Sequence, residues 1–220
     1  MEANSKSNKV DLIKNDMKQI CKNIQEKHLE GRKFDTQKIK KWAENIINDI
    51  EVSLKKKYPE YGYGILFYIS DKTIFISNNR AIDYLDTDIT LLQSYDTDYF
   101  FSEIRIFANK KYSKRNNFLE NISSDEIIKI NKKLNEYLEG REFIYEKCEK
   151  YLDNLVQDIN NILLDRKNRP CSYHVGFIND LPIKNLYFTY KFFDLEYMPF
   201  FFSYSNDSLS CNVYLFIVNN

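Results

Sequence analysis

The stretch Leu29-Glu30-Gly31-Arg32-Lys33-Phe34 occurs a second time, almost unchanged, as Leu138-Glu139-Gly140-Arg141-Glu142-Phe143. The two copies are offset by 109 residues (138 − 29). At this offset Trp42 aligns with Tyr151, and Ser94-Tyr95 aligns with Ser203-Tyr204. Matches near both ends of the copies, at one spacing, indicate an internal repeat rather than a chance motif. We therefore predict two tandem units, residues 1–110 and 120–220.

Two amphipathic helices open the first unit. Their apolar residues recur every three or four positions, which places one apolar stripe on each helix. The first helix is predicted over residues 10–29, and Gly31 ends it because a positive φ costs glycine little. Asp35 or Thr36 is expected to cap the second helix. The stripes consist of Ile13, Met17, Ile20 and Ile24, and then of Ile39, Trp42, Ile46, Ile50 and Leu54.

The second unit repeats this pattern. Its first helix is expected to start at Ser123-Ser124-Asp125-Glu126, where hydroxyl and carboxylate groups can accept hydrogen bonds from the first backbone amides. Gly140 is expected to end that helix. A second stripe follows, and it consists of Cys148, Tyr151, Leu155, Ile159 and Leu163.

After the helices, the apolar period changes to two and β-branched and aromatic residues dominate, which predicts strands. Short links between consecutive strands favour an antiparallel sheet, and helices followed by strands favour the α+β class. We expect four strands in each unit: Tyr61–Ser70, Lys72–Tyr84, Ile89–Tyr95 and Tyr99–Asn109, then Ser172–Asn179, Lys184–Asp194, Met198–Ser205 and Leu209–Val218.

Composition and charge exclude several classes of protein. Lys+Arg and Asp+Glu are both 32, so the formal net charge is zero and neither nucleic acid nor an acidic membrane is an expected partner. Apolar runs are too short to span a membrane, and residues 1–10 lack the apolar core of a signal peptide. The cysteines are scattered, which indicates free thiols in the reducing cytoplasm; they are Cys21, Cys148, Cys171 and Cys211.

Catalytic and cofactor sites are not predicted. His28 lies at an expected helix end, where a surface imidazole is ordinary. Cys171 and His174 share a strand, but residues three apart point to opposite faces. Acidic turns contain Asp83, Asp86, Asp88, Asp96 and Asp98, without the spacing of a calcium loop. Glycine-rich phosphate-binding motifs are also missing, so the chain is expected to be no enzyme and to need no metal or cofactor.

The aromatic strands are better suited to packing than to binding bases. Tyr187, Phe188, Tyr190, Phe192 and Phe193 precede a run of three phenylalanines, but no basic track accompanies them. Because Phe200, Phe201 and Phe202 are consecutive, both faces of that strand are apolar. Such a strand is typical of one that is buried between two layers or covered by a partner.

This order of elements resembles that of the Tctex-type dynein light chains. The residues that carry the resemblance are Phe34, Lys38, Trp42, Ile46-Ile47 and Tyr61-Gly62-Tyr63-Gly64-Ile65, and in the second unit Phe143, Lys147, Tyr151, Leu155-Val156 and Cys171-Ser172-Tyr173-His174-Val175. The resemblance implies a light chain that dimerises by exchanging second strands and holds dynein intermediate chains or other proteins. Two units in one chain then predict an intrachain pseudo-dimer with the same exchange.

The function implied is that of a non-catalytic subunit of a dynein, ciliary or axonemal complex, located in the cytoplasm on the cytoskeleton. It would bind extended peptide segments of partner proteins by β-augmentation. The expected partner-binding or inter-unit residues lie on the third strands: Leu91, Gln93, Tyr95, Phe200, Phe202 and Tyr204. Two alternatives are a structural brick of the cytoskeleton or axoneme without a motor role, and a small α+β enzyme or toxin-immunity protein.

Overall fold

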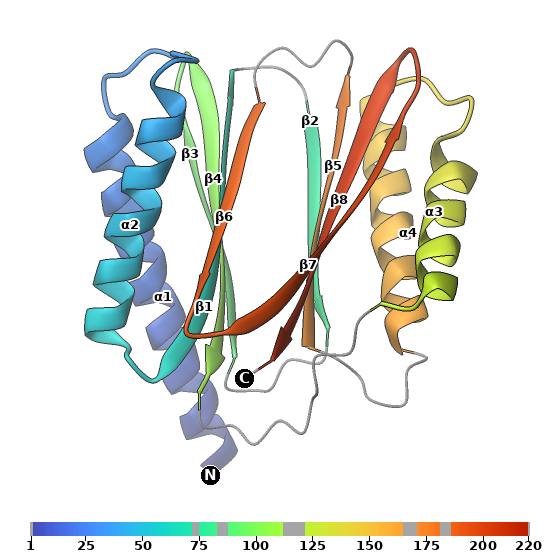
Figure 1. Ribbon diagram of the computed structural model, residues 1–220. Helices are drawn as coiled ribbons and strands as arrows, with labels where there is room; N and C mark the ends of the chain where they lie inside the picture. Colours follow the sequence, from blue (N-terminus) through green and yellow to red (C-terminus); the bar gives the residue numbers. More distant parts are fainter. Residues whose placement is uncertain are drawn as a thin grey trace.

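The computed structural model describes residues 2–71, 75–82, 88–111, 122–164, 171–180 and 186–219. Within these residues, each half of the chain contains two helices followed by four strands (Figure 1). All strand pairs are antiparallel; they are β1–β4, β1–β6, β2–β5, β3–β4, β5–β8 and β7–β8. The predicted α+β class is therefore confirmed.

The helices follow the apolar stripes. They are α1 (Glu2–Leu29), α2 (Ile39–Lys57), α3 (Ser124–Leu138) and α4 (Tyr145–Leu164). Gly31 and Gly140 follow α1 and α3 with φ angles of +68° and +66°, as expected of glycines that end helices. Helix α1 begins at Glu2, well before the predicted start at Val10, because its polar first turns continue the helix beyond the apolar stripe.

The predicted caps of α2 and α3 have different outcomes. The Ser123 hydroxyl accepts a hydrogen bond from the Glu126 amide at 3.3 Å, and the Glu126 carboxylate accepts one from the Ser123 amide at 2.8 Å, which forms a capping box. The expected cap of α2 is wrong, because that helix begins after Lys38 without a side-chain cap. Asp35 instead accepts a hydrogen bond from the Gln37 amide at 3.0 Å and closes a turn before the helix.

Two four-stranded sheets form, with orders β3-β4-β1-β6 and β2-β5-β8-β7. Each sheet thus contains three strands from one half of the chain and one strand from the other. The strands are β1 (Tyr61–Asp71), β2 (Phe75–Ile82), β3 (Ile89–Asp96), β4 (Phe100–Lys110), β5 (Cys171–Asp180), β6 (Leu186–Phe193), β7 (Glu196–Ser205) and β8 (Leu209–Asn219).

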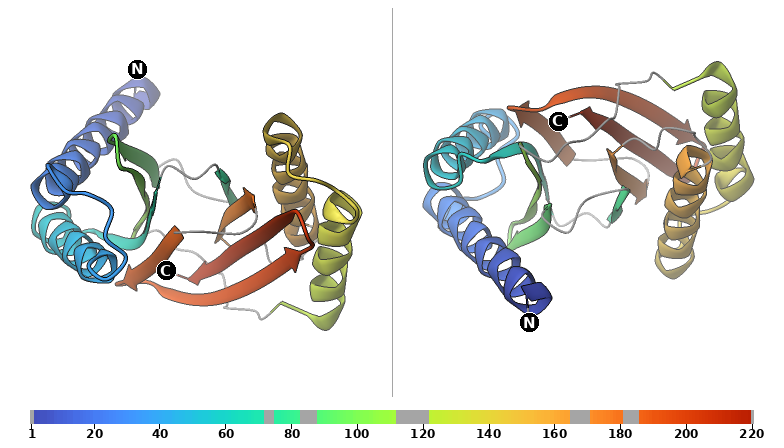
Figure 2. Two further views of the ribbon diagram at one scale, coloured as in Figure 1. Left: turned by 90° about the horizontal axis from the view of Figure 1, so that it is seen from above. Right: turned by 90° about the horizontal axis from the view of Figure 1, so that it is seen from below.

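The two sheets lie between the helix pairs, so the molecule has four layers (Figures 1 and 2). Helices α1 and α2 pack on the β3-β4-β1-β6 sheet and bury the first core, which contains Trp42, Ile46 and Phe67. Helices α3 and α4 bury the second core on the other sheet. The inner faces of the sheets meet in a third cluster, whose buried members are Leu66, Tyr68, Phe107, Phe177 and Phe216.

Two glycines of β1 allow the turn between β6 and β7 to approach closely. A Cβ atom on Gly62 would lie 2.4 Å from the Asp194 carbonyl oxygen, and one on Gly64 would lie 2.4 Å from the Phe192 ring. Both distances are shorter than real Cβ contacts allow. A larger residue at Gly62 would meet backbone and push the end of β6 away, whereas one at Gly64 would require the Phe192 ring to move.

Carboxylates tie α1 to α2. The Asp49 carboxylate accepts hydrogen bonds from the Lys27 ammonium at 2.8 Å and, at the same distance, pairs with the His28 imidazole. These bonds, first that of Lys27 and then that of His28, hold the pKa of Asp49 below its ordinary value of 3.8. The Asp16 pKa is also lowered, chiefly by a hydrogen bond from Lys57.

We expect these lowered pKa values to make the fold acid-sensitive. A carboxyl with a lower pKa when folded stabilises the native state above its unfolded pKa, and that contribution is lost as the pH falls through the folded pKa. Asp49→Asn should therefore weaken the dependence of the free energy of unfolding on pH below about 4. Urea unfolding between pH 3 and pH 7 measures this. Asp98→Asn, in an exposed turn, is the control, and equal slopes for the two variants would contradict the prediction.

Candidate functional site

The predicted site residues of β3 face the helices. Leu91 is buried in the first core, and Tyr95 packs against that core. Gln93 lies on the same face with 9% of its surface exposed, and its side-chain amide donates a hydrogen bond to the Ser94 carbonyl at 2.7 Å. These three side chains therefore support the packing of α1 on the sheet. Strand β3 itself is an edge strand of that sheet.

The predicted site residues of β7 have the same orientation. Phe202 is buried in the second core, and Phe200 and Tyr204 are half-buried against that core. Strand β7 is also terminal in its sheet. The structure thus places all six predicted residues on terminal strands. Five of them belong to or pack against the helix-covered cores, and Gln93 is nearly buried on the same face of β3.

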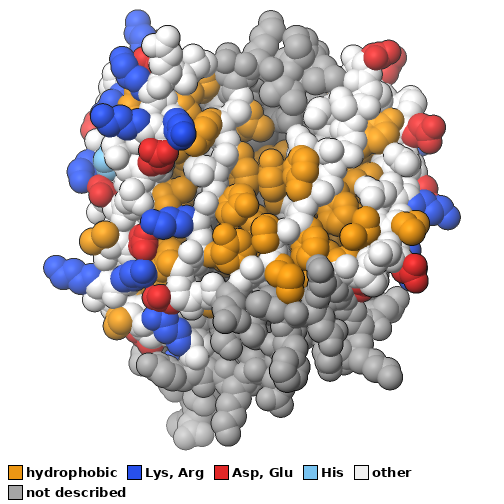
Figure 3. All heavy atoms as spheres, viewed as in Figure 1, with side chains coloured by type: hydrophobic (Ala, Val, Ile, Leu, Met, Phe, Trp, Pro, Cys, Tyr) orange, Lys and Arg blue, Asp and Glu red, His pale blue; other side chains and the backbone are white. Residues whose placement is uncertain are grey.

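On its opposite face, β7 contributes Phe201 to an aromatic strip, which we define as Phe188 of β6, Phe201 of β7 and Tyr214 of β8. Phe201 is 56% exposed, and its ring centroid lies 5.0 Å from that of Tyr214 on β8. The Tyr214 ring lies in turn 4.4 Å from Phe188 on β6. Apolar side chains gather in the middle of the face that carries β6 and β7, and charged side chains lie over the helices beside it (Figure 3). The aromatic strip therefore continues the inter-sheet cluster to the surface.

Strand β6 is anchored to the first half of the chain. The Lys191 ammonium pairs with the Glu51 carboxylate of α2 and donates to the Asn48 side chain at 3.1 Å. Burial would raise the pKa of Glu51, but hydrogen bonds from Lys191 and Lys55 outweigh it and hold that pKa below its ordinary value. The Lys55 ammonium also lies 4.8 Å from the Phe193 ring centroid, a cation–π distance.

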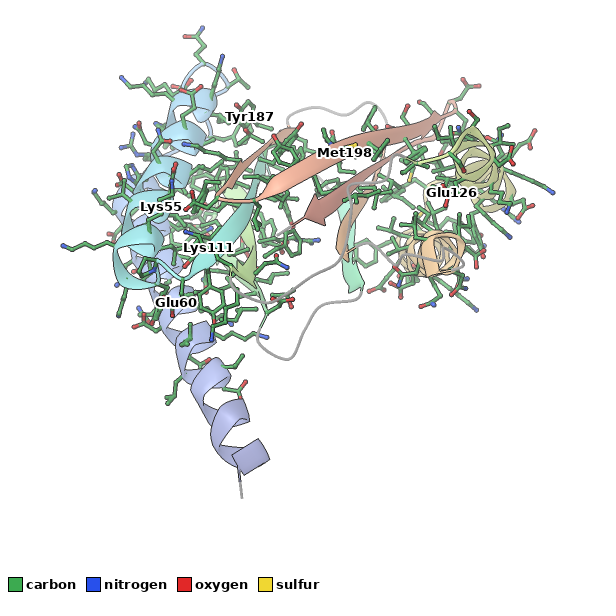
Figure 4. All side chains as sticks on the ribbon, turned by 60° about the horizontal axis from the view of Figure 1, so that its bottom comes forward. Lys55, Glu60, Lys111, Glu126, Tyr187 and Met198 are labelled. Carbon is green, nitrogen blue, oxygen red and sulfur yellow. The ribbon has the colours of Figure 1, made fainter. Side chains whose placement is uncertain are left out.

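The turn after β6 is held as well. Lys111 donates to the Asp194 carboxylate at 3.0 Å and to the Pro59 carbonyl at 2.9 Å, and Asp194 has a φ of +56°. Figure 4 labels Lys55 and Lys111, the two lysines of the first half that reach this turn and the end of β6. Strand β6 is thus fixed along β1 and at its turn. It is the last strand in the order β3-β4-β1-β6, so its other edge is an edge of the sheet. A fixed terminal strand is a ready template for pairing with another segment.

Thiol chemistry has little support in the described residues. Burial raises the pKa of Cys21 to about 12, and it raises the pKa of Cys211 to the same value. Such thiols are protonated at neutral pH and are poor nucleophiles. The side chains of Cys171 and His174, which the sequence pairs on one strand, lie outside the described side chains.

The acidic turns do not come together as a metal site in the part of the chain that the structure describes. No group of three or more His, Cys, Asp or Glu side chains there could hold a metal ion. Asp88 is buried and Asp96 ends β3, while Asp98 lies in the following turn. Asp83 and Asp86 lie outside the described residues.

Among the helices that the structure describes, none combines the length and the apolar character needed to span a membrane.

The sequence contained a signal for the aromatic strip. Phe200, Phe201 and Phe202 make both faces of β7 apolar, so one face had to contact something other than the helices. The sequence could not show which of the two apolar faces of β7 packs against α3 and α4, and so which face is left for the aromatic strip. The aromatic residues of β6 were predicted to pack in a core or interface, and Phe188 and Tyr190 do pack against the inter-sheet cluster.

Comparison with protein families gives a match over the first half of the chain. The sequence model of the Tctex-1 family matches residues 11–109, which contain most of α1, all of α2, β1, β2 and β3, and β4 except for its last residue. No curated protein matches the chain significantly. The predicted resemblance is thereby confirmed over the first half, and the match does not extend to the second half. Residues 11–109 of the chain are similar to the Tctex-1 family.

Proposed function

We propose that the chain is a non-catalytic, light-chain-like subunit of a dynein, ciliary or axonemal complex. It would consist of two Tctex-like units, residues 1–110 and 120–220, packed as an intrachain pseudo-dimer. The order of helices and strands is the same in both halves. The β3–β4 and β7–β8 pairings share one register, since Leu92 opposite Arg105 and Phe201 opposite Tyr214 are pairs related by the 109-residue offset of the repeat (201 − 92 and 214 − 105).

The cross-pairing of β6 with β1 and of β2 with β5 is the observation that carries this proposal. Each pairing is what strand exchange between two units would produce. Covalent linkage raises the effective concentration of one unit at the other, so that pairing no longer depends on protein concentration. It also allows the two units to present different surfaces to a partner.

The partner would be a protein that contributes an extended segment. Strand β6 offers a terminal edge beside the aromatic strip. A segment that pairs with this edge would gain backbone hydrogen bonds and cover Phe201. Because Phe201 is 56% exposed, covering its ring removes apolar surface from water. The intermediate chain of dynein is the partner that the family similarity suggests.

Calorimetry of the intact chain with a dynein intermediate chain from the same organism tests the proposal. Phe201→Ser is expected to weaken binding at least tenfold, about 1.4 kcal/mol, since it removes an aromatic anchor. Ile128→Ser, at a 63% exposed site on α3, should leave the affinity unchanged. Equal affinities for the two variants, or no binding by the native chain, would contradict the proposal.

A further inference from the structure

The inner faces of the two sheets carry equivalent positions with different residues. We call Leu92, Glu103 and Arg105 the first-half floor. The residues at the 109-residue offset form the second-half floor. Leu92 pairs with Arg105 across β3 and β4. The Arg105 guanidinium lies 5.8 Å from the Tyr68 ring centroid, so this floor faces the inter-sheet cluster.

The second-half floor consists of Phe201, Asn212 and Tyr214. Phe201 pairs with Tyr214 across β7 and β8, in the same register as the first-half pair. Tyr214 packs against the inter-sheet cluster, where its ring lies 6.1 Å from that of Phe177. The two floors therefore occupy corresponding places on the two sheets, each at a terminal strand.

The two floors differ in charge and in exposure. Glu103 and Arg105 pair with each other, and only 5% and 3% of their surfaces are exposed. Their counterparts Asn212 and Tyr214 are half-buried and uncharged. At the terminal strands, Leu92 is 40% exposed and Phe201 is 56% exposed. The first-half floor is thus charged and covered, whereas the second-half floor is aromatic and open.

These differences in charge and exposure affect how favourably an apolar segment would bind at each place. An apolar segment laid on the second-half floor would cover the ring of Phe201 and the remaining exposed surface of Tyr214, which is favourable. On the first-half floor the same segment would find little surface to cover beyond Leu92. It would also lie beside a buried ion pair, whose charges an apolar side chain cannot satisfy.

We infer that the chain binds one extended partner segment, on the second-half floor along β6, and none at the equivalent place on the first-half floor. The segment carries large apolar side chains at alternate positions, because successive residues of a paired strand face opposite sides and only one side meets the aromatic rings. The open floor is continuous with the inter-sheet aromatic cluster, which is already an apolar interface. This inference rests on the proposed binding of extended segments.

A peptide selected from a random phage-displayed library on the intact chain serves as the probe, and calorimetry gives its stoichiometry. One peptide per chain is expected, with binding lost in Phe201→Ser and retained in Leu92→Ser, the matched variant of the first-half floor. Hydrogen exchange should show new protection of backbone amides in β6. Two peptides per chain would overturn the inference while leaving the proposed function intact. One peptide whose binding depends on Leu92 alone would overturn the inference and the proposed role of Phe201 together. If no peptide binds the native chain, both fail.

Transplanting the floor gives a second test. The double variant Glu103→Asn/Arg105→Tyr places the residues of the second-half floor at the equivalent positions and removes both charges together. We expect this variant to bind a second peptide, which raises the stoichiometry from one to two. A folded double variant, with native circular dichroism, that still binds one peptide would show that charge and exposure at these positions do not set the number of sites.

Discussion

Produced separately, residues 1–116 and 117–220 are each expected to fail to form a folded monomer. Without the second half, β1 loses its pairing with β6, and β2 loses its pairing with β5. The inner aromatic faces would also be exposed; Tyr68, Phe107, Phe177 and Phe216 are at most 3% exposed in the intact chain. Unpaired strand edges beside exposed aromatic rings favour aggregation.

Mixing the two fragments should restore a complex with the 26.4 kDa mass of the intact chain. Light scattering, together with circular dichroism before and after mixing, measures this outcome. The intact chain is the control and should be monomeric and fold cooperatively. If each fragment alone is soluble, monomeric and cooperatively folded, the cross-pairing of strands is dispensable, and the linkage only tethers two independent domains.

Arg105→Leu is expected to cost about 3–5 kcal/mol of stability, because it leaves the Glu103 carboxylate buried without its partner. Only 5% of Glu103 is exposed, and Arg105 both pairs with it and lies over Tyr68. Without Arg105, the Glu103 carboxylate keeps a hydrogen bond from the Ser94 hydroxyl at 3.5 Å but has no opposite charge beside it, so its burial becomes unfavourable. Urea unfolding at pH 7 measures the loss.

The double variant Glu103→Leu/Arg105→Leu should recover most of this loss, because it removes both charges and retains apolar volume. Arg141→Leu is a control at an exposed arginine near Tyr151, where a change within about 0.5 kcal/mol is expected. Additive losses in the double variant would mean that the two side chains do not depend on each other and would contradict the buried-pair argument.

Local features of the fold could be predicted from the sequence, because short-range chemistry determines them. Gly31 and Gly140 end helices by their positive φ, and Ser123 starts one with its hydroxyl. The cap of α2 was predicted wrongly, since the Asp35 side chain accepts a hydrogen bond from the Gln37 amide in the turn before the helix. The start of α1 was missed because its first residues carry no apolar stripe, and the stripe was the signal used.

The candidate site was harder to predict, because it depends on which face of a strand meets the helices. Leu91 and Leu92 are alike as residues, yet the first is 6% exposed and the second 40%. Phe201 and Phe202 differ in the same way, at 56% and 5%. A shift of one residue exchanges the two faces of a strand, and only the position of the helices selects between them.

The glycines of β1 bear on which strand can complete its sheet. A strand exchanged between units could equally complete a sheet in a neighbouring molecule, and repeated exchange of that kind builds open-ended filaments. Gly62 and Gly64 leave room for Asp194 and the Phe192 ring, whereas the positions at the repeat offset in β5 are Cys171 and Tyr173. The two receiving strands therefore accept different donors. A joint between two first halves would place β2 of one molecule on β1 of the other, where the glycines fit β6 instead, so pairing of unlike halves is favoured over pairing of like halves.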